Sequence, residues 1–456
     1  MQGLLSSLEI IVLAAGQGRR MASARPKVLH TLAGRPLLAH VLDTATALAP
    51  RAIHVVYGHG GDRVRDSFPE AQVDWVMQPS QKGTGDAVRC ALPRLDDQSL
   101  ALVLLGDVPL IGRDTLKTLC ERAVNGAALL TFEASHDNQY GRIVRDAQGL
   151  VERIVEWRDA TPEQRLIREV NSGVLAAPVA RLRHWIPRLT SANAQGELYL
   201  TDVIALAVAD GIAVATASPA RVAEVEGVNS RADLAVLERA YQDERAQTLM
   251  ASGAQLMDPG RIDVRGSIVT GRDVLIDVNC VFEGRVEIGD DVHIGPHCVI
   301  RDSRIASGAR IEAHSVMDGA EVGAGCVVGP FARLRPGTVL GARARVGNFV
   351  EVKASQVGAN SKINHLSYVG DASIGARVNI GAGVITCNYD GARKHRTVIG
   401  DDAFIGSDTQ LVAPVEVGAG ATVGAGTTLT KDAPAGELTL SRVAQKTVNG
   451  WRRPEK

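Results

Sequence analysis

Aliphatic residues recur at every sixth position through much of the second half of the chain. The regular runs are Ile288, Ile294 and Ile300, then Val322, Val328, Leu334, Leu340, Val346 and Val352, and finally Ile399, Ile405, Leu411, Val417, Val423 and Leu429. A helix repeats its apolar positions every ~3.6 residues and a strand every second residue, so neither explains this spacing. Stacked coils with inward aliphatic residues do explain it. The pattern therefore predicts a left-handed parallel β-helix of hexapeptide repeats over residues 260–435, interrupted by a polar insertion near 388–396.

The first half of the chain has a different pattern. Continuous apolar runs at residues 10–13, 53–56 and 102–105 alternate with amphipathic segments such as 37–48. Strands of a parallel sheet are apolar on both faces, and helices connect them. Residues 9–228 are therefore expected to form an α/β, Rossmann-like domain with a mostly parallel sheet.

A helix is predicted between these two patterns. Ser230 and Asp233 have the spacing of an N-terminal capping pair, and apolar residues follow at helical intervals. We therefore expect domains at residues 1–229 and 254–456, joined by a linker helix at 230–253. The second domain is expected to end in a basic tail after Pro434.

Composition narrows the class of partner. The chain of 456 residues has 50 Lys and Arg against 51 Asp and Glu, which argues against a nucleic-acid partner attracted by bulk charge. The sequence has no apolar run approaching the ~18 to 20 residues of a membrane span and no basic start of a signal peptide. Its six cysteines are too few for a disulfide framework, and Cys298 and Cys326 fall at core positions of the repeat. We expect a cytoplasmic protein with small-molecule substrates and no membrane insertion.

A glycine-rich turn follows the first predicted strand. Gly16 and Gly18 lie in this turn, with Arg20 and Lys27 shortly after it. Such a turn lets backbone N–H groups approach a phosphate, and the two basic side chains add charge-assisted hydrogen bonds. Met21 stands where a dinucleotide fingerprint needs its third glycine, which weakens that alternative. A purely structural turn remains open.

Two more polar segments end predicted strands. Asp107 follows Gly106 directly after the apolar run at 102–105, and Gln78 precedes Gly83 and Thr84. Open α/β sheets bind ligands at the carboxyl ends of their strands. A carboxylate in that place commonly holds Mg²⁺ against substrate phosphates. Asp107 could equally cap the turn that follows it.

One histidine of the predicted β-helix lies close to an inward aliphatic position. His365 comes two residues after Ile363 and precedes Tyr368. A neutral imidazole is suited to take a proton from an amine near neutral pH. An isolated histidine is nevertheless more often structural than catalytic, so the residues themselves leave both alternatives open.

The motifs of both halves together resemble those of a known family. The segment Leu13, Ala14, Ala15, Gly16, Gly18, Arg20 and Met21, followed by Lys27 and by Gly106 with Asp107, is similar to the sugar-1-phosphate nucleotidyltransferases. Together with a hexapeptide β-helix of this length, it resembles the bacterial bifunctional N-acetylglucosamine-1-phosphate uridylyltransferases and glucosamine-1-phosphate acetyltransferases. The resemblance implies acetyl-CoA-dependent N-acetylation of glucosamine-1-phosphate. It also implies Mg²⁺-dependent uridylyl transfer from UTP to the acetylated sugar phosphate, with release of pyrophosphate, and a homotrimer built through the β-helix.

The resemblance also assigns residues to the uridylyl-transfer site. It implies that Asp107 and Asn229 hold the Mg²⁺. The residues implied to bind UTP and the UDP-sugar are Leu13, Ala14, Ala15, Gly16, Arg20, Lys27, Gln78, Gly83, Thr84, Gly106, Asp107, Gly141, Glu156, Asn171 and Asn229. Leu105 stands where members of the family often have an aromatic residue.

The acetyl-transfer residues follow from the same resemblance. It implies that His365 is the general base and that Glu351 orients it. The residues implied to bind glucosamine-1-phosphate are Arg335, Lys353, Tyr368, Asn379 and Lys394. Those implied for acetyl-CoA are Ala382, Asn388, Tyr389, Ser407, Ala425 and Arg442.

Three alternatives compete with this interpretation. The first is a monofunctional sugar-1-phosphate nucleotidyltransferase whose β-helix serves oligomerisation without catalysis. The second is a hexapeptide-repeat metalloenzyme that binds Zn²⁺ through His293, His297 and His314. The third is a scaffold without catalysis, for which a phosphate-binding turn would be superfluous.

Overall fold

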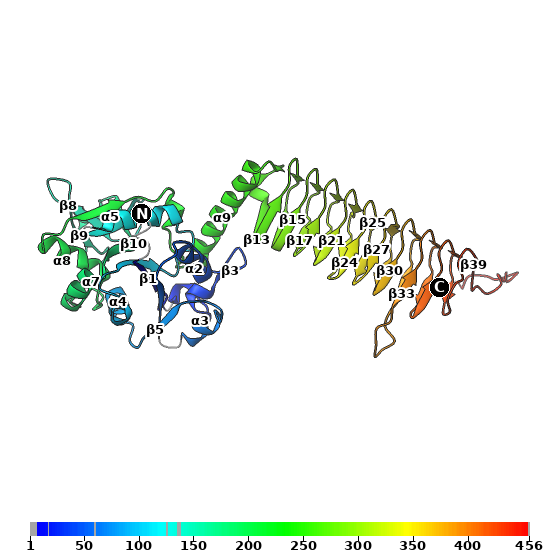
Figure 1. Cartoon of the computed structure of the whole chain (residues 1–456), viewed down its shortest axis with the longest axis horizontal. Coiled ribbons are helices and arrows are strands. Elements are labelled where there is room, and N and C mark those ends of the chain that lie inside the picture. Colours follow the sequence, from blue (N-terminus) through cyan, green and yellow to red (C-terminus); the bar gives the residue numbers. More distant parts are fainter. Residues whose placement is uncertain (1–6, 17, 59–60, 125, 135–137, 455–456) are drawn as a thin grey trace. The chain divides into compact units, whose positions relative to one another are not determined.

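The chain folds into two compact units, which the computed structural model describes over residues 7–16, 18–58, 61–124, 126–134 and 138–454 (Figure 1). The first unit comprises Met1–Tyr241 and the second Gln242–Lys456. Each unit has buried cores of its own.

A sheet of mixed direction forms the centre of the first unit. Its strand order is β11-β7-β10-β6-β1-β4-β5, and the pair β8 and β9 extends from β10. The strands are β1 (Leu8–Leu13), β4 (Ala52–Gly58), β5 (Asp74–Gln78), β6 (Leu100–Leu105), β7 (Ala127–Glu133), β8 (Arg142–Arg145), β9 (Val151–Val155), β10 (Glu169–Pro178) and β11 (Val214–Ala217). A small separate pair is formed by β2 (Thr31–Leu32) and β3 (Arg35–Pro36).

Helices accompany this sheet in the manner of an α/β domain. They are α2 (Leu37–Ala47), α3 (Asp62–Asp66), α4 (Thr84–Ala91), α5 (Arg113–Ala123), α6 (Pro162–Arg165), α7 (Val179–Trp185) and α8 (Val203–Ala209). The helix α9 (Arg231–Ala251) begins in the first unit and ends in the second, where Ala246 and Leu249 join the core of the coils. Residues along β1 face two different cores in alternation, since Ile10 and Val12 belong to one buried cluster and Ile11 to another. Burial on both faces explains the continuous apolar runs in the sequence.

The strand β10 departs from the expected parallel arrangement. It runs antiparallel to both β6 and β7, whereas β1 is parallel to β4 and β6. Between β7 and β10 the chain forms the antiparallel pair β8 and β9 rather than a long crossover helix. A parallel neighbour requires a crossover connection. Because the chain has none between β7 and β10, β10 runs antiparallel and the sheet is mixed.

The capping pair predicted from the sequence is present at the start of α9. The Ser230 N–H donates to Asp233 Oδ2 at 2.8 Å, and the Asp233 N–H donates to Ser230 Oγ at 3.2 Å. This reciprocal arrangement satisfies two of the N–H groups that a helix start leaves unpaired. Among the described residues, none of the helices combines the length and the apolar character that crossing a membrane requires.

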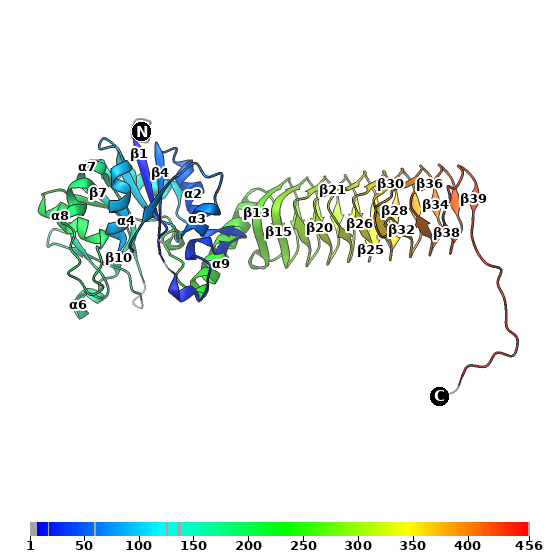
Figure 2. The same ribbon diagram turned by 90° about the horizontal axis from the view of Figure 1, so that it is seen from below.

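The second unit is a stack of coils, each contributing strands to parallel sheets (Figure 1; Figure 2). One sheet contains β12 (Gln255–Leu256), β14 (Leu275–Ile276), β16 (His293–Ile294), β19 (Arg310–Ile311), β22 (Val327–Val328), β25 (Arg345–Asn348), β28 (Lys362–His365), β31 (Asn379–Ile380), β34 (Phe404–Ile405), β37 (Thr422–Val423) and β39 (Leu438–Thr439). We call it the first face.

The remaining strands of this unit form a larger sheet that covers the other faces of the coils. They are β13 (Ile262–Thr270), β15 (Cys280–Ile288), β17 (Val299–Arg301), β18 (Arg304–Ile305), β20 (Val316–Asp318), β21 (Ala320–Val322), β23 (Arg333–Leu334), β24 (Thr338–Leu340), β26 (Glu351–Lys353), β27 (Gln356–Val357), β29 (Tyr368–Gly370), β30 (Ala372–Ile374), β32 (Ile385–Cys387), β33 (Thr397–Ile399), β35 (Gln410–Val412), β36 (Val415–Val417) and β38 (Thr428–Leu429). The predicted parallel β-helix is therefore confirmed.

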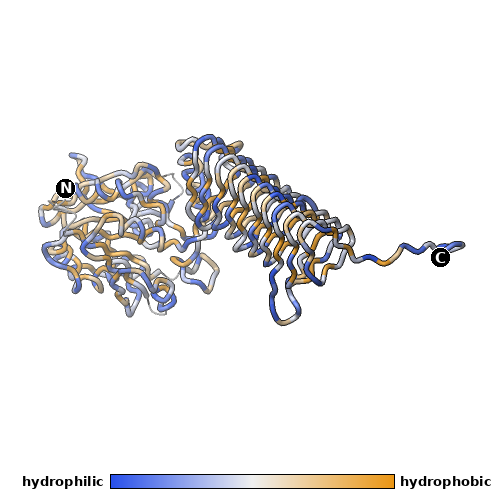
Figure 3. The backbone as a smooth tube through the Cα atoms, turned by 45° about the vertical axis from the view of Figure 1, so that its right-hand side comes forward, coloured by the Kyte–Doolittle hydropathy of each residue, from blue (hydrophilic) through white to orange (hydrophobic). Residues whose placement is uncertain are grey.

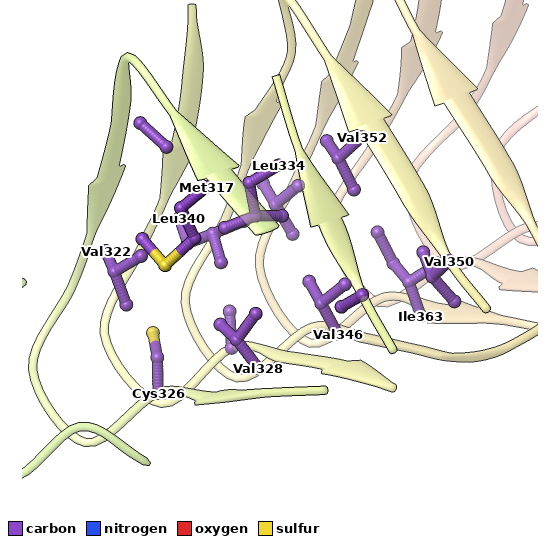
Figure 4. Packing of buried hydrophobic residues seen from close by; sticks show 14 of the residues in the cluster. Met317, Val322, Cys326, Val328, Leu334, Leu340, Val346, Val350, Val352 and Ile363 are labelled. Atoms are coloured by element: carbon purple, nitrogen blue, oxygen red, sulfur yellow. The ribbon is translucent and has the colours of Figure 1, made fainter. Parts of the chain in front are cut away.

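The six-residue period corresponds to one continuous core. All the aliphatic residues of the three regular runs belong to a single buried cluster, and Figure 4 shows several of them converging inside the coils. Cys298 and Cys326 are both fully buried in this cluster, as expected from their place in the repeat. Along each coil the chain alternates between apolar and polar stretches (Figure 3). Stacking is what buries these residues, because one coil cannot cover its own apolar face.

The polar insertion changes the length of one coil. Ile363 pairs with Ile380 in the next coil, and Ile380 pairs in turn with Ile405, so one turn is much longer than the other. The extra residues form the loop beside β33 in Figure 1, closed by an antiparallel bridge between Tyr389 and Lys394. The inward aliphatic position is restored after the loop, so the core continues past the insertion without a shift.

Candidate active sites

A cleft of about 850 Å³ opens at the carboxyl ends of the central strands of the first unit. It is lined by Leu13, Ala14, Ala15, Gly16, Lys27, Val28, Gln78, Pro79, Gln81, Gly83, Thr84, Ala87, Leu105, Asp107 and Glu197. Most of the residues assigned to UTP by resemblance are in this set. The carboxyl ends of β1, β5 and β6 supply many of them, which is where open α/β sheets bind ligands.

The glycine-rich turn packs directly against the segment that carries Lys27. Gly18 has φ +60°, and a Cβ atom there would lie 2.7 Å from Lys27 Cβ. The Met21 N–H donates to the Gly18 carbonyl at 2.9 Å and closes the turn. Glycine is therefore required for both the backbone conformation and the close approach. Arg20 lies on the same turn with an exposed side chain, outside the lining of the cleft.

Asp107 and Asn229 converge on one positive charge. Lys27 Nζ donates to Asp107 Oδ2 and, at 3.3 Å, to Asn229 Oδ1. The backbone brings these distant segments together, since the Val228 N–H donates to the Asp107 carbonyl at 2.9 Å. A carboxylate and an amide oxygen that share a cation are the hard oxygen donors that Mg²⁺ prefers.

The loop after β5 is held by its own polar side chains. The buried Gln78 amide donates to the Gly83 carbonyl at 3.2 Å and to Asp86 Oδ2 at 2.8 Å. The Leu198 carbonyl accepts from the Gly85 N–H at 2.8 Å. Thr84 Oγ1 accepts from the Leu200 N–H at 3.1 Å. The side-chain amide of Gln78 thus already donates its hydrogen bonds to the protein, and Gly83 and Thr84 line the cleft beside it.

Two polar side chains of the cleft, Gln81 and Glu197, were not predicted from the sequence. Gln81 donates to the Ala15 carbonyl and so connects the loop after β5 to the glycine-rich turn. Glu197 reaches the cleft from a segment far along the chain. The place of Gln81 between Gln78 and Gly83 could have suggested its role, whereas nothing in the local pattern points to Glu197.

A smaller cavity of about 120 Å³ adjoins the cleft and shares Leu13, Thr84 and Leu105 with it. Glu156 and Asn171 also line this cavity. The rest of its lining is largely apolar. Leu105 lines the cavity where members of the family often have an aromatic side chain.

Glu156 is the carboxylate that lines the smaller cavity. Burial raises its pKa, Asp202 and Asp159 nearby act in the same direction, and a 2.9 Å hydrogen bond from Thr201 Oγ1 opposes them. Gly141 touches the same carboxylate, because a Cβ atom on Gly141 would lie 3.4 Å from Glu156 Oε2. The Asn171 N–H donates to the Gly141 carbonyl at 2.8 Å. The residues assigned to the sugar therefore lie together.

In the second unit, His365 belongs to a column of turn residues at one corner of the β-helix. Each member lies two residues after an inward aliphatic of the first face, and the column consists of Asn348, His365, Ala382, Ser407 and Ala425. Backbone hydrogen bonds follow the column, since the Asp408 N–H donates to the Ala382 carbonyl at 2.7 Å and the Gly426 N–H to the Ser407 carbonyl at 2.8 Å. The predicted base and three predicted acetyl-CoA residues are thus aligned.

Asn348 orients the His365 ring, which sequence reasoning missed. His365 Nδ1 lies 2.9 Å from Asn348 Oδ1 in the preceding coil. An amide oxygen accepts only, so Nδ1 carries the hydrogen and the exposed imidazole presents its Nε2 lone pair outward. The length of one coil could have revealed this pair in the sequence, because Asn348 and His365 occupy the same place in successive coils.

Glu351 has a different partner from the one expected. Its carboxylate accepts from Arg335 Nη1 at 2.8 Å and lies 3.6 Å from Arg333. Within one chain the hydrogen-bond partner of His365 is therefore Asn348, and Glu351 orients Arg335. The expectation that Glu351 holds His365 is not met inside a single chain, because the two side chains lie on different faces of the coil.

The residues assigned to glucosamine-1-phosphate gather around β26 and β29. Lys353 lies 3.6 Å from Asp371, and Asn388 donates to Asp371 and, at 3.5 Å, to the Tyr368 hydroxyl. Lys394 belongs to the same group, since its hydrogen bond with Lys353 and that residue's charge lower the pKa of Lys394. Two neighbouring lysine side chains whose positive charges oppose each other are suited to bind an anion.

Three other assigned residues lie apart from this group. Asn379 is on the first face, beside Lys362 of the preceding coil. Tyr389 is exposed, and its hydroxyl donates to the Gly391 carbonyl at 2.6 Å. Arg442 belongs to an exposed segment without regular structure, yet a Cβ atom on Gly424 would lie 3.5 Å from its Nη2. The tail thus returns to the end of the column at Ala425.

The zinc alternative finds no support in the coil geometry. His297 and His314 stack with their centroids 4.7 Å apart, and Phe331 continues the stack. His293 lies within a strand of the first face, before the turn that carries His297. In the part of the chain that the structure describes, no group of three His, Cys, Asp or Glu side chains is arranged to hold a metal ion.

Known families and proteins match both units. Residues 10–195 match the MobA-like NTP transferase domain, 264–365 the GMPPB C-terminal domain, and 396–431 six repeats of the bacterial transferase hexapeptide. The chain is 60% identical over 450 residues to the bifunctional protein GlmU of an Azoarcus species, covering 98% of this chain and 100% of that protein. The chain belongs to the bifunctional GlmU family. The GlmU of Bordetella parapertussis is 59% identical over 454 residues, with 98% of this chain and 99% of that protein covered.

Membership of the GlmU family decides between the alternatives left open by the sequence. The chain is a bifunctional uridylyltransferase and acetyltransferase of UDP-N-acetylglucosamine synthesis. The alternatives of a monofunctional nucleotidyltransferase, a zinc enzyme and a scaffold are therefore wrong.

Proposed function

We propose that the cleft of the first unit is the uridylyl-transfer site and that Asp107 and Asn229 hold Mg²⁺ there. The observation that carries this proposal is the contact of both side-chain oxygens with the Lys27 ammonium. These two groups already share one positive charge, so their donor set fits a hard cation. When bound, Mg²⁺ supplies positive charge to the phosphate oxygens of UTP as pyrophosphate leaves.

The chain's own residues then position the two substrates. Backbone N–H groups of the turn at Gly16 and the side chains of Arg20 and Lys27 hold the triphosphate, and Gly83 and Thr84 enclose the uridine. The remaining nucleotide contacts would come from Leu13, Ala14, Ala15, Gln78 and Gly106. Gly141, Glu156 and Asn171 hold the acetylated sugar in the smaller cavity, so its phosphate faces the α-phosphorus in the cleft. Catalysis of this type depends on in-line positioning and on neutralising negative charge.

For acetyl transfer, we propose that His365 is the general base. A protonated amine cannot attack a thioester, and the Nε2 lone pair that Asn348 turns outward can take the proton. Ala382, Ser407, Ala425 and Arg442 would contact acetyl-CoA along the column, and Asn388 and Tyr389 would contact it from the polar insertion. Arg335, Lys353, Tyr368, Asn379 and Lys394 would bind glucosamine-1-phosphate, and Glu351 supports this group through Arg335.

We further propose that this second site is completed by neighbouring copies in a homotrimer. His365 and Tyr368 lie on either side of a corner at Leu366, which has φ +50° and is 62% exposed. Side chains on two sides of a convex corner diverge, so one chain cannot enclose a substrate between them. A trimer should therefore be seen by light scattering, and a mixture of His365→Ala and Lys394→Ala chains, unfolded and refolded together, should regain acetyl transfer. A fully active monomer would contradict the trimer.

We also place both reactions in the cytoplasm. The described structure contains six free cysteines, several of them buried, which suits a reducing compartment. UTP and acetyl-CoA would be the co-substrates there.

A reaction in which each component is left out in turn tests the two activities and their order. Purified protein is given glucosamine-1-phosphate, acetyl-CoA, UTP and Mg²⁺, and free thiol and pyrophosphate are followed together. We expect thiol release without UTP, and pyrophosphate only when every component is present. Chelating Mg²⁺ should stop pyrophosphate release and leave thiol release unchanged, because the proposed metal ligands lie in the first unit. Loss of both signals on chelation would contradict this placement of the metal.

A further inference from the structure

Arg142 is a buried cation that the two proposed sites do not use. Its side chain is almost fully buried, and burial lowers its pKa. The guanidinium donates to neutral oxygens, which are Asn138 Oδ1 at 2.6 Å, the Tyr140 carbonyl at 2.8 Å and, more weakly, the Asn138 and Arg165 carbonyls. Among the described residues no carboxylate pairs with it. A buried charge without an opposite charge is costly, so these neutral oxygens and the surrounding groups must stabilise the guanidinium.

An indole ring completes the surroundings of Arg142. The guanidinium carbon of Arg142 lies 4.6 Å from the centroid of the Trp157 ring, and that of Arg165 lies 4.9 Å from the same centroid. Two guanidinium groups thus contact one aromatic ring. Cation–π contacts of this kind gain strength when they are withdrawn from water.

The backbone of Arg142 connects the three residues proposed to hold the sugar. Arg142 pairs with Val155 of β9 and with Val170 of β10. The next residues along the chain are Glu156 and Asn171, and the residue before Arg142 is Gly141 (β8, β9 and β10 in Figure 1). One position in the sheet therefore neighbours all the proposed sugar contacts.

Strand geometry places the Arg142 side chain behind those contacts. Successive residues of a strand point to opposite faces, so Gly141, Glu156 and Asn171 lie on one face and Arg142 on the other. A Cβ atom on Gly141 would lie 2.9 Å from Ile154 Cγ2, which shows how closely the two strands approach on the sugar side. Arg142 and Trp157 fill the reverse side at the same level.

We propose that Arg142, clamped against Trp157, is a positioning residue that sets the spacing of Gly141, Glu156 and Asn171 for the sugar phosphate. This inference rests on the proposed sugar site. The guanidinium fixes the turn at Asn138 and Tyr140 that leads into Gly141, and Trp157 fixes the chain immediately after Glu156. A displacement of about 1 Å in such contacts can cost up to ~10²-fold.

The test uses the full-length protein and steady-state uridylyl transfer at saturating Mg²⁺. Arg142→Met keeps the length of the side chain but removes its donors and charge. We expect the KM for N-acetylglucosamine-1-phosphate to rise about tenfold or more, with kcat and the KM for UTP within roughly twofold. The KM of Arg142→Lys for the sugar phosphate should lie between that of the unchanged protein and that of Arg142→Met. An ammonium group keeps the charge but cannot reproduce the planar set of guanidinium donors.

Trp157 provides a second, independent pair of variants. Trp157→Leu should raise the same KM, whereas Trp157→Phe keeps a ring under the guanidinium and should stay close to the unchanged protein. Arg145→Met is the matched control, because Arg145 lies on the same strand but pairs with Glu169. A kcat and a KM for UTP close to those of the unchanged protein report that the first unit of each variant is folded. If Arg142→Met does not fold, the two Trp157 variants decide the question.

Glu156→Gln separates this inference from the proposed sugar site. If Glu156→Gln leaves the KM for the sugar phosphate unchanged, the proposed sugar site is wrong. If it raises that KM while Arg142→Met and Trp157→Leu do not, the sugar site stands and the positioning role is overturned. Equal increases in the KM for UTP and for the sugar phosphate would also overturn it, because they would indicate general loosening of the fold.

Discussion

Replacing Asp107 by alanine is expected to lower uridylyl transfer by about 10³-fold while acetyl transfer stays within roughly twofold. Asp107 is the carboxylate of the proposed metal pair, and Lys27 Nζ contacts both Asp107 and Asn229. Removing it takes away an anionic ligand of Mg²⁺ and frees Lys27 from its position. The measurement is pyrophosphate release from UTP and N-acetylglucosamine-1-phosphate, with free thiol followed in a parallel acetyl-transfer assay.

The matched control is Asp114→Ala in α5. The Asp114 side chain is 96% exposed, so its loss should change neither activity. Asp107→Asn keeps the shape of the side chain and should also be strongly impaired, because a neutral amide binds Mg²⁺ more weakly than a carboxylate does. If Asp107→Ala lost both activities together, the assignment of separate sites to the two units would fall.

The second large effect is expected from His365→Ala, which should lower acetyl transfer by at least about 10²-fold, the contribution of a general base. The uridylyl-transfer rate should stay unchanged. The exposed imidazole has its Nδ1 held by Asn348, so Nε2 is the atom available to accept the proton of the attacking amine. The measurement is thiol release at saturating acetyl-CoA and glucosamine-1-phosphate.

His293→Ala is the control for this experiment. His293 also lies on the first face, but far from the column that contains His365, so its replacement should leave acetyl transfer intact. Asn348→Ala tests the orientation of the ring and should reduce the rate less than His365→Ala does. A decrease below threefold for His365→Ala would remove this histidine from the role of base.

The departures from expectation have a common physical origin. β10 is antiparallel because the chain between β7 and β10 forms β8 and β9 instead of a crossover helix, which the apolar runs do not reveal. Glu351 pairs with Arg335 because the two lie on neighbouring coils of the same sheet, whereas His365 ends a strand of the first face. In both cases, strand direction or coil register decided which residues meet.

What the sequence by itself determined is the β-helix, the α/β class of the first half, the helix start at Ser230 and the family. Stacking buries the inward position of each coil, so that position is aliphatic in every repeat. The architecture can therefore be predicted from a short period in the sequence. The capping pair is likewise local, as the bonds between Ser230 and Asp233 show.

Tertiary structure decided which polar groups act on one another. Lys27 meets Asn229 from 202 positions away, and Asn348 meets His365 from 17 positions away. The buried Arg142 lies behind the proposed sugar contacts because three strands meet at it. Such contacts depend on strand order and register over the whole sheet, and these are set by packing rather than by any local pattern.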